Sequence, residues 1–266
     1  MEKPKFDIAY RRKLLYKRKR RRQLIFRLVL LFICIIVFSL FLLFNKKSSI
    51  NKNITASTTS NNNTDNKIVV CIDPGHGDWD IGAKGLSGSL EKDIVLDISL
   101  KLGKLLEENG IKVIYTRTND SLSWLDTAND SLKERIKIPE VLKSDLFVSI
   151  HCNSDYTNQE SKGVETWYKS QDDNSENLAM TIQNALINAN YTDNRNIKTY
   201  KNTEDALAVL ELNSSIPVLL ELGFLSNTSD ERYLKSDKGQ DVIALAIKNA
   251  LLTYIEENKT TILKKR

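Results

Sequence analysis

The sequence predicts an α/β fold: one domain with a twisted, mostly parallel sheet of about six strands, flanked by helices on both faces and preceded by one transmembrane helix. Three observations predict it. From residue 67 onward, short apolar runs rich in β-branched residues alternate with segments whose apolar residues recur at helical spacing. A nearly continuous apolar run occupies positions 24–44. A polar stretch without apolar periodicity separates the two.

The first 66 residues divide into three parts. Residues 1–23 form a basic arm, with eleven Lys and Arg in the first 22 positions against Glu2 and Asp7. Residues 24–44 would span about 30 Å as a helix, at ~1.5 Å per residue, which is enough for a bilayer core. Residues 45–66 are rich in Asn, Ser, Thr and Lys and are predicted to be a flexible polar linker.

The apolar run is predicted to be an uncleaved signal anchor, and a cleaved signal peptide is the alternative. The apolar core of a signal peptide is usually shorter and is followed by small residues at a cleavage site. Here residues 28–44 carry no charge, and Asn45, Lys46 and Lys47 follow. The positive-inside rule then keeps the basic arm in the cytoplasm. We therefore expect a single-pass protein of the cell membrane with its folded domain outside.

The net charge of +5 does not indicate a nucleic-acid partner. The basic charge is concentrated in the arm, and the rest of the chain has 28 Lys and Arg against 32 Asp and Glu. A nucleic-acid-binding domain would carry its basic residues on its own folded surface. Orientation of the anchor explains the arm more simply, so no nucleic acid is predicted as a partner. No pattern in the sequence indicates an oligomeric state.

The folded domain is predicted over residues 67–258, with a basic tail at 259–266. Its first strand begins at Ile68 as a run of apolar and β-branched residues. That run ends at Asp73, where the following Pro and Gly are a turn signal.

The next elements alternate helix and strand. The helix at 91–109 has apolar residues at helical spacing and is closed by Gly110 as a C-terminal cap. The helix at 131–144 contains Pro139, which is expected to kink or split it. The remaining predicted strands are 111–117, 145–151, 163–169, 206–211 and 217–222, and the remaining predicted helices are 176–190 and 239–257.

The chain has only two histidines, and both follow apolar strand-like runs. His76 lies just past the first strand, and His151 ends the strand at 145–151. In open α/β sheets, ligands and catalytic groups lie at the carboxyl ends of the strands. A lone histidine is more often structural than functional, but two at the same kind of position favour a functional site.

Two carboxylates complete a candidate site. Glu91 opens the first helix, where an acid stabilising the helix dipole is the alternative interpretation. Glu221 lies inside an apolar strand, where a buried structural ion pair is the alternative. Two imidazoles and one carboxylate form a common catalytic zinc site with a position left for water, and a further carboxylate can move a proton. These residue types fit metal-assisted amide hydrolysis, although no local motif such as HExxH selects the ligands.

Six segments carry a family resemblance. They occur in the family's order and cover about residues 68–257. The segments are Ile72-Asp-Pro-Gly-His-Gly77, Leu90-Glu-Lys-Asp93, Thr116-Arg-Thr-Asn-Asp120, Leu146-Phe-Val-Ser-Ile-His-Cys-Asn153, Gly163-Val-Glu-Thr-Trp-Tyr168 and Leu220-Glu-Leu-Gly-Phe-Leu-Ser-Asn227. With these segments, the sequence resembles the zinc-dependent N-acetylmuramoyl-L-alanine amidases, the AmiC-like cell-wall hydrolases.

The resemblance implies that His76, Glu91 and His151 hold one Zn²⁺ per chain and that Glu221 is the catalytic acid/base. It implies a peptidoglycan substrate, cut at the amide between the lactyl group of N-acetylmuramic acid and L-alanine of the stem peptide. The domain would then act as an autolysin facing the cell wall. The alternatives are a catalytically inactive wall-binding module of the same fold and a zinc peptidase that cuts within the stem peptide.

The chain departs from the family pattern in three places. Pro139 and the two residues after it replace an Ala-Asn segment usual before the third strand. Cys152 follows the predicted ligand His151 and is expected to point to the opposite face of its strand. The short loop at 152–162 leaves no room for the inserted helix that blocks the site in some relatives. We expect Cys71 and Cys152 to be buried free thiols.

Overall fold

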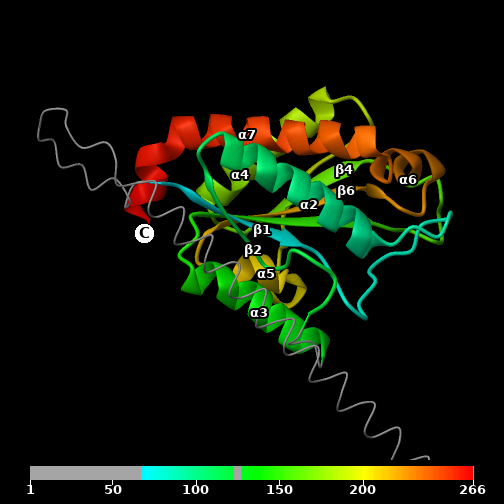
Figure 1. The fold of residues 1–266 in the computed structure, drawn as a ribbon, viewed down its shortest axis with the longest axis horizontal. Helices are drawn as coiled ribbons and strands as arrows, with labels where there is room; N and C mark the ends of the chain where they lie inside the picture. The colour runs from blue at the N-terminus through cyan, green and yellow to red at the C-terminus, as the bar shows by residue number, and fades with distance from the viewer. Residues whose placement is uncertain (1–66, 123–126, 266) are drawn as a thin grey trace, which may run out of the picture. The chain divides into compact units, whose positions relative to one another are not determined.

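Figure 1 shows the fold in a computed structural model, which describes residues 67–122 and 127–265. These residues belong to one compact unit, residues 62–266. None of the helices in this described part is long and apolar enough to cross a membrane. The predicted arm, anchor and linker at residues 1–66 lie outside the described residues.

Six strands form one sheet in the order β2-β1-β3-β6-β4-β5. All neighbouring strands are parallel except β4 and β6, which are antiparallel. The sheet is therefore mostly parallel, as predicted, and the carboxyl ends of β2, β1, β3 and β6 lie at one edge. The strands are β1 (Val69–Pro74), β2 (Lys112–Tyr115), β3 (Leu146–Asn153), β4 (Val164–Tyr168), β5 (Asn194–Lys198) and β6 (Ile216–Phe224).

Helices cover both faces of the sheet, as predicted (Figure 1). One face packs against α2 (Glu91–Glu108), α4 (Asp173–Asn188) and α7 (Asp237–Lys264), which together bury the larger apolar core. The other face carries α3 (Ala128–Val141) and α5 (Ala208–Glu211) over a smaller core around Phe147 and Leu219. The sequence accounts for this, since β1, β3 and β6 are apolar on both faces, as expected for strands buried on two sides.

The predicted strand at 206–211 is wrong. The chain there forms the short helix α5, preceded by a 3₁₀ turn, η1 (Thr203–Asp205). Val209 and Leu210 are buried against the smaller core, so one helical turn satisfies the apolar run. The sixth strand is β5 instead, a polar segment at the sheet edge that sequence periodicity did not mark.

The helices differ from the expectation at several places, and α4, for example, begins three residues before its predicted start at 176. The helix α3 begins three residues earlier than predicted and ends at Val141, with Pro139 inside its last turn. A short helix that was not predicted, α6 (Thr228–Leu234), precedes α7. The helix α7 continues through most of the predicted basic tail, because Ile262 is buried in the larger core.

Candidate active site

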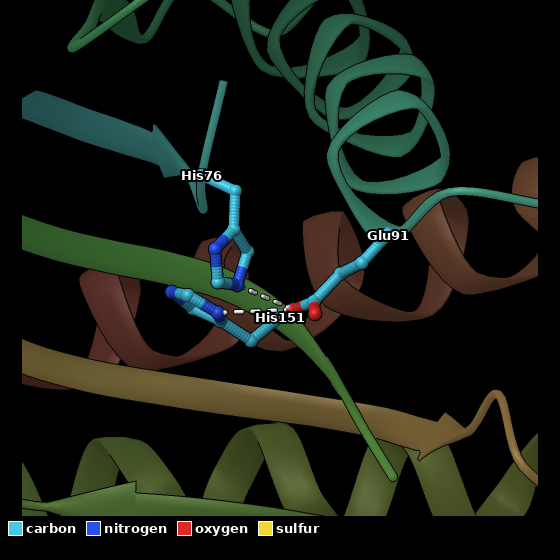
Figure 2. A group of neighbouring side chains, drawn as sticks. All are labelled: His76, Glu91 and His151. Atoms are coloured by element: carbon cyan, nitrogen blue, oxygen red, sulfur yellow. Dashed lines mark hydrogen bonds and ion pairs between the residues drawn. The ribbon is translucent and has the colours of Figure 1, made fainter. Parts of the chain in front are cut away.

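Three side chains that are far apart in the sequence meet at the carboxyl edge of the sheet: His76, Glu91 and His151 (Figure 2). His76 follows β1, Glu91 is the first residue of α2, and His151 lies near the end of β3. The Oε1 atom of Glu91 lies 3.1 Å from His76 Nε2 and 3.1 Å from His151 Nδ1. One potential ligand atom from each residue lies within 4.8 Å of the other two.

The donor set fits a zinc ion. Two imidazole nitrogens and a carboxylate oxygen are common catalytic zinc ligands, and bond lengths of about 2.0–2.2 Å put tetrahedral ligands roughly 3.3 Å apart. The two nitrogen–oxygen separations of 3.1 Å are close to that spacing. In the described chain, this is the one His/Cys/Asp/Glu group that could hold a metal ion.

The carboxylate of Glu91 is oriented by backbone donors. Its Oε2 accepts a hydrogen bond from Ala83 N at 2.7 Å, and its Oε1 accepts one from Cys152 N at 2.9 Å. Burial alone would raise the pKa of Glu91, but hydrogen bonds from His151 and His76 outweigh it and hold that pKa well below its usual range. Glu91 is therefore an anion, the state that a metal ligand needs.

The two histidines have different environments. Burial works to lower the pKa of His76, but its hydrogen bond to Glu91 outweighs that effect, and the pKa is raised overall. The second ring nitrogen of His76 is 2.9 Å from Asp80 Oδ2, an outer contact of the kind that orients metal-binding histidines. Deeper burial lowers the pKa of His151, despite its contact with Glu91.

The turn after β1 is shaped for this close approach. His76 has a φ of 61°, a left-handed conformation that non-glycine residues rarely adopt. A Cβ atom on Gly75 would lie 2.3 Å from Cε1 of His151. A Cβ atom on Gly82, which has a φ of 64°, would lie 2.5 Å from Glu91 Oε2. Glycine at both positions therefore leaves room for the ring and the carboxylate.

Arg117 ties the same turn to the first helix. Its guanidinium donates to the carbonyl oxygens of Pro74 at 3.1 Å, Gly75 at 2.8 Å and Lys92 at 2.8 Å. The side chain is buried, so these bonds also satisfy donors that would otherwise be costly to bury.

The ring of His151 contacts an ion pair formed by Arg135 and the buried Asp73. Arg135, on α3, donates to both carboxylate oxygens of Asp73, at 2.8 and 2.6 Å. Its Nη2 also lies 3.1 Å from His151 Nε2. Thr116 and Ser149 each donate to Asp73 at 2.7 Å. Burial would raise the pKa of Asp73, but Arg135 and these hydroxyl groups hold it at about 2.

Glu221 lies on β6 directly beside His151 on β3. Paired residues of neighbouring strands project from the same face, so the carboxyl group lies on the side of the metal-ligand group. Its Oε2 is buried and has no hydrogen-bond partner in the described chain. Burial raises the pKa of Glu221 well above its usual value, and the charges of Glu91 and Glu165 add to the increase. A buried ion pair, the structural alternative, is not what holds this oxygen.

The two cysteines in the domain are free and buried, as expected. Cys152 packs in the larger core and Cys71 in the smaller one, so they lie on opposite faces of the sheet. Cys152 therefore points away from the neighbouring His151 and does not join the metal-ligand group. The loop at 154–163 contains no helix, which confirms that no inserted blocking helix follows β3.

Sequence reasoning did not identify the supporting residues Asp73, Asp80, Arg117 and Arg135. Asp73 carried a usable signal, since a carboxylate at the end of an apolar strand needs partners when it is buried. Arg117 falls in one of the segments of the family resemblance, but its carbonyl partners lie 25 to 43 positions away and gave no local sign of its role. Arg135 carried no signal, because Asp73 lies 62 positions away.

Comparison with known proteins identifies the family to which this fold and site belong. The fold and site define a protein with a mostly parallel α/β sheet and a candidate metal centre at the carboxyl edge of that sheet. The profile of the family described as N-acetylmuramoyl-L-alanine amidase matches residues 70–253. The chain belongs to this family of cell-wall amidases, so its enzyme class is that of an amide hydrolase acting on peptidoglycan.

Three similar proteins illustrate the relationship. The amidase LytC of Bacillus subtilis is 35% identical over 187 residues, which cover 70% of this chain and 35% of LytC. The germination-specific amidase of Bacillus subtilis is 29% identical over 199 residues, covering 71% of this chain and 80% of that protein. The CwlD amidase of Clostridioides difficile, solved in complex with the GerS lipoprotein, has a TM-score of 0.66 and 32% identity, covering 72% of this chain and all of that one.

Proposed function

We propose that this protein is a zinc-dependent N-acetylmuramoyl-L-alanine amidase that cuts the amide between the lactyl group of muramic acid and L-alanine. His76, Glu91 and His151 would hold one zinc ion, and Glu221 would be the general acid/base. The observation that carries the proposal is the convergence of the three ligands with a buried carboxyl oxygen of Glu221 that has no protein partner.

The chain's own residues supply the proton transfer. A bound zinc ion would polarise the amide carbonyl and lower the pKa of a bound water. Because burial raises the pKa of Glu221, its carboxylate is a stronger base than that of an exposed glutamate, which favours accepting a proton from water. Glu221 can therefore take the proton of the attacking water and pass it to the departing amine of L-alanine.

The location follows from the sequence. Residues 24–44 would anchor the chain in the cell membrane, and the linker at 45–66 would carry the domain to the outer side. That side is where peptidoglycan lies, so the proposed topology and the proposed substrate agree. Reaction of an added cysteine near Ser48 with a membrane-impermeant thiol reagent on intact cells tests it, and labelling only after lysis would contradict it.

Two substitutions test the proposed roles. Glu221→Gln should keep full zinc content and an unchanged melting temperature, yet release L-alanine amine at least about a hundredfold more slowly, since acid/base catalysis contributes ~10²–10⁴-fold. Glu91→Gln replaces an anionic ligand with a neutral one, so its zinc content after dialysis should fall. Glu160→Gln, on the exposed loop after β3, is the matched control.

The outcomes separate the possible errors. Loss of zinc by Glu221→Gln, with zinc retained by Glu91→Gln, would mean that the two roles are exchanged. Normal rates in both variants would place the catalytic site elsewhere. Mass spectrometry of digested wall distinguishes the alternatives: an intact stem with a free L-alanine amine supports the amidase, a cut stem indicates a peptidase, and no cleavage indicates a binding module.

A further inference from the structure

A buried carboxylate with two cationic partners lies beside Glu221, on the side away from the metal-ligand group. Glu165 of β4 is paired in register with Glu221, and its side chain is only 3% exposed. Its Oε2 accepts hydrogen bonds from Arg195 Nε at 2.8 Å and from Lys198 Nζ at 2.5 Å. Both cations come from β5, the edge strand next to β4.

The cluster brings two cations to one ion-paired carboxylate. The other oxygen of Glu165, Oε1, accepts from Trp167 Nε1 at 3.1 Å and from Asn153 Nδ2 at 3.3 Å. Four donors therefore satisfy a single negative charge, while Arg195 and Lys198 bring two positive ones. Glu221, the proposed base on the neighbouring strand, offsets the second positive charge only while it is ionised.

The two cations are held in place and still reach solvent. The side chain of Arg195 is 36% exposed and that of Lys198 is 32% exposed, in contrast to the buried carboxylate. The guanidinium of Arg195 lies over the Phe224 ring at 4.8 Å, and Lys198 Nζ lies 5.6 Å from the centre of the Trp167 ring. Cations fixed by a carboxylate and an aromatic ring lose little side-chain entropy when they bind an anion.

We propose that Arg195 and Lys198 bind a carboxylate of the substrate, namely that of the acidic second residue of the stem peptide, next to L-alanine. This inference rests on the proposed function and extends it to substrate selection. The enzyme would prefer stems whose second residue keeps its free carboxylate over stems in which that group is amidated. An amide has no negative charge to pair with either cation.

The dimensions suit this assignment. Neighbouring strands lie ~4.8 Å apart, so β5 is roughly 10 Å from the backbone of Glu221, and its two cations reach back toward β4. An extended peptide advances ~3.5 Å per residue, which puts the carboxylate of the second residue about 7 Å from the amide that is cut. With that amide at Glu221, the carboxylate falls within reach of the two cations.

The test compares two substrates that differ in one group. Full-length protein in detergent is given N-acetylmuramoyl-L-alanyl-D-isoglutamate or the corresponding D-isoglutamine compound, and kcat/KM is measured for each. We expect the free acid to be preferred about two- to fivefold, the scale of a partly exposed ion pair. Lys198→Gln and Arg195→Gln should each reduce this ratio toward one. Lys198→Arg should retain it, and the exposed control Lys201→Gln should leave it unchanged.

Three results would overturn the inference. One is equal kcat/KM for the two substrates in the unaltered protein. Another is an equal loss of rate on both substrates in Lys198→Gln, which would mean that the lysine only supports Glu165. If neither compound is hydrolysed, digestion of whole wall decides the proposed function separately, and calorimetric binding of the same two compounds decides the inference. Tighter binding of the acid, lost in Lys198→Gln, would support it, whereas equal or undetectable binding would overturn it.

Discussion

The buried pair of Asp73 and Arg135 gives the most quantitative prediction for stability. Arg135→Met keeps much of the volume of the side chain but removes both hydrogen bonds to Asp73, at 2.8 and 2.6 Å. Asp73 is fully buried and would keep only the hydroxyl groups of Thr116 and Ser149 as partners. Removing one member of a buried ion pair costs about 3–5 kcal/mol, because the other charge stays buried without compensation.

The dependence on pH gives a second magnitude. The pKa of Asp73 is about 2 in the folded protein, against an ordinary value of 3.8. A carboxyl group whose folded pKa is lowered stabilises the fold above the unfolded pKa and loses that contribution as pH falls toward the folded pKa. The difference corresponds to about 2 kcal/mol, lost between pH ~4 and ~2. In Arg135→Met, we expect burial to raise the pKa of Asp73 instead. As pH falls, Asp73 is then protonated in the folded variant, and the cost of burying its unpaired charge disappears. The difference in unfolding free energy between the unaltered protein and the variant therefore becomes smaller.

Urea unfolding at pH 7 and pH 4.5, with a chelator present so that metal binding does not contribute, measures both effects. The exposed pair of Lys137 and Glu134 on the same helix supplies the control, and Lys137→Met should cost at most ~0.5 kcal/mol. Asp73→Asn combined with Arg135→Met should cost less than the sum of the single changes, since each leaves the other group unpaired. A loss below about 1 kcal/mol for Arg135→Met, equal at both pH values, would refute the reasoning.

Three further predictions concern the domain and its metal. A fragment of residues 67–266 should be soluble and active without the anchor, and a fragment that only aggregates while the full chain is active in detergent would contradict this. One zinc ion should bind per chain and be lost in His76→Ala and in His151→Ala, as metal analysis after dialysis would show; one equivalent retained by the double variant would refute the ligand set. Gly75→Ala should lower zinc affinity, because its Cβ would lie 2.3 Å from the His151 ring, and unchanged affinity in a folded variant would argue against that contact.

The sequence predicts the central part of the sheet and the metal-ligand group for the same physical reason. The strands β1, β3 and β6 are buried on both faces, so their apolar runs stand out against the polar segments around them. A histidine or carboxylate at the end of such an apolar run stands out, because it is polar where the strand is apolar. Parallel pairing brings the carboxyl ends of these strands to one edge of the sheet. The sequence alone therefore predicts that His76 and His151 lie close together.

The periphery of the sheet lacks that contrast. Asn194–Lys198 is polar because it is an edge strand, and its pairing with β4 is set by contacts across the fold. The apolar run before Ile216 looks like a strand in isolation, yet Val209 and Leu210 need only one helical turn to reach the smaller core. Tertiary packing determines that Asn194–Lys198 is a strand and that the run with Val209 and Leu210 is a helix. The local periodicity of the sequence does not contain this information.

The residues that position the site form a third class. Arg117 binds backbone carbonyl oxygens, which every residue presents, so no particular partner residue marks it in the sequence. Arg135 has a side-chain partner, Asp73, but the two lie on different elements and meet only when α3 packs under the sheet. The chemistry of a site can therefore be seen in residues that conflict with their local pattern. The two arginines that hold it in place conform to theirs, and only the folded structure identifies them.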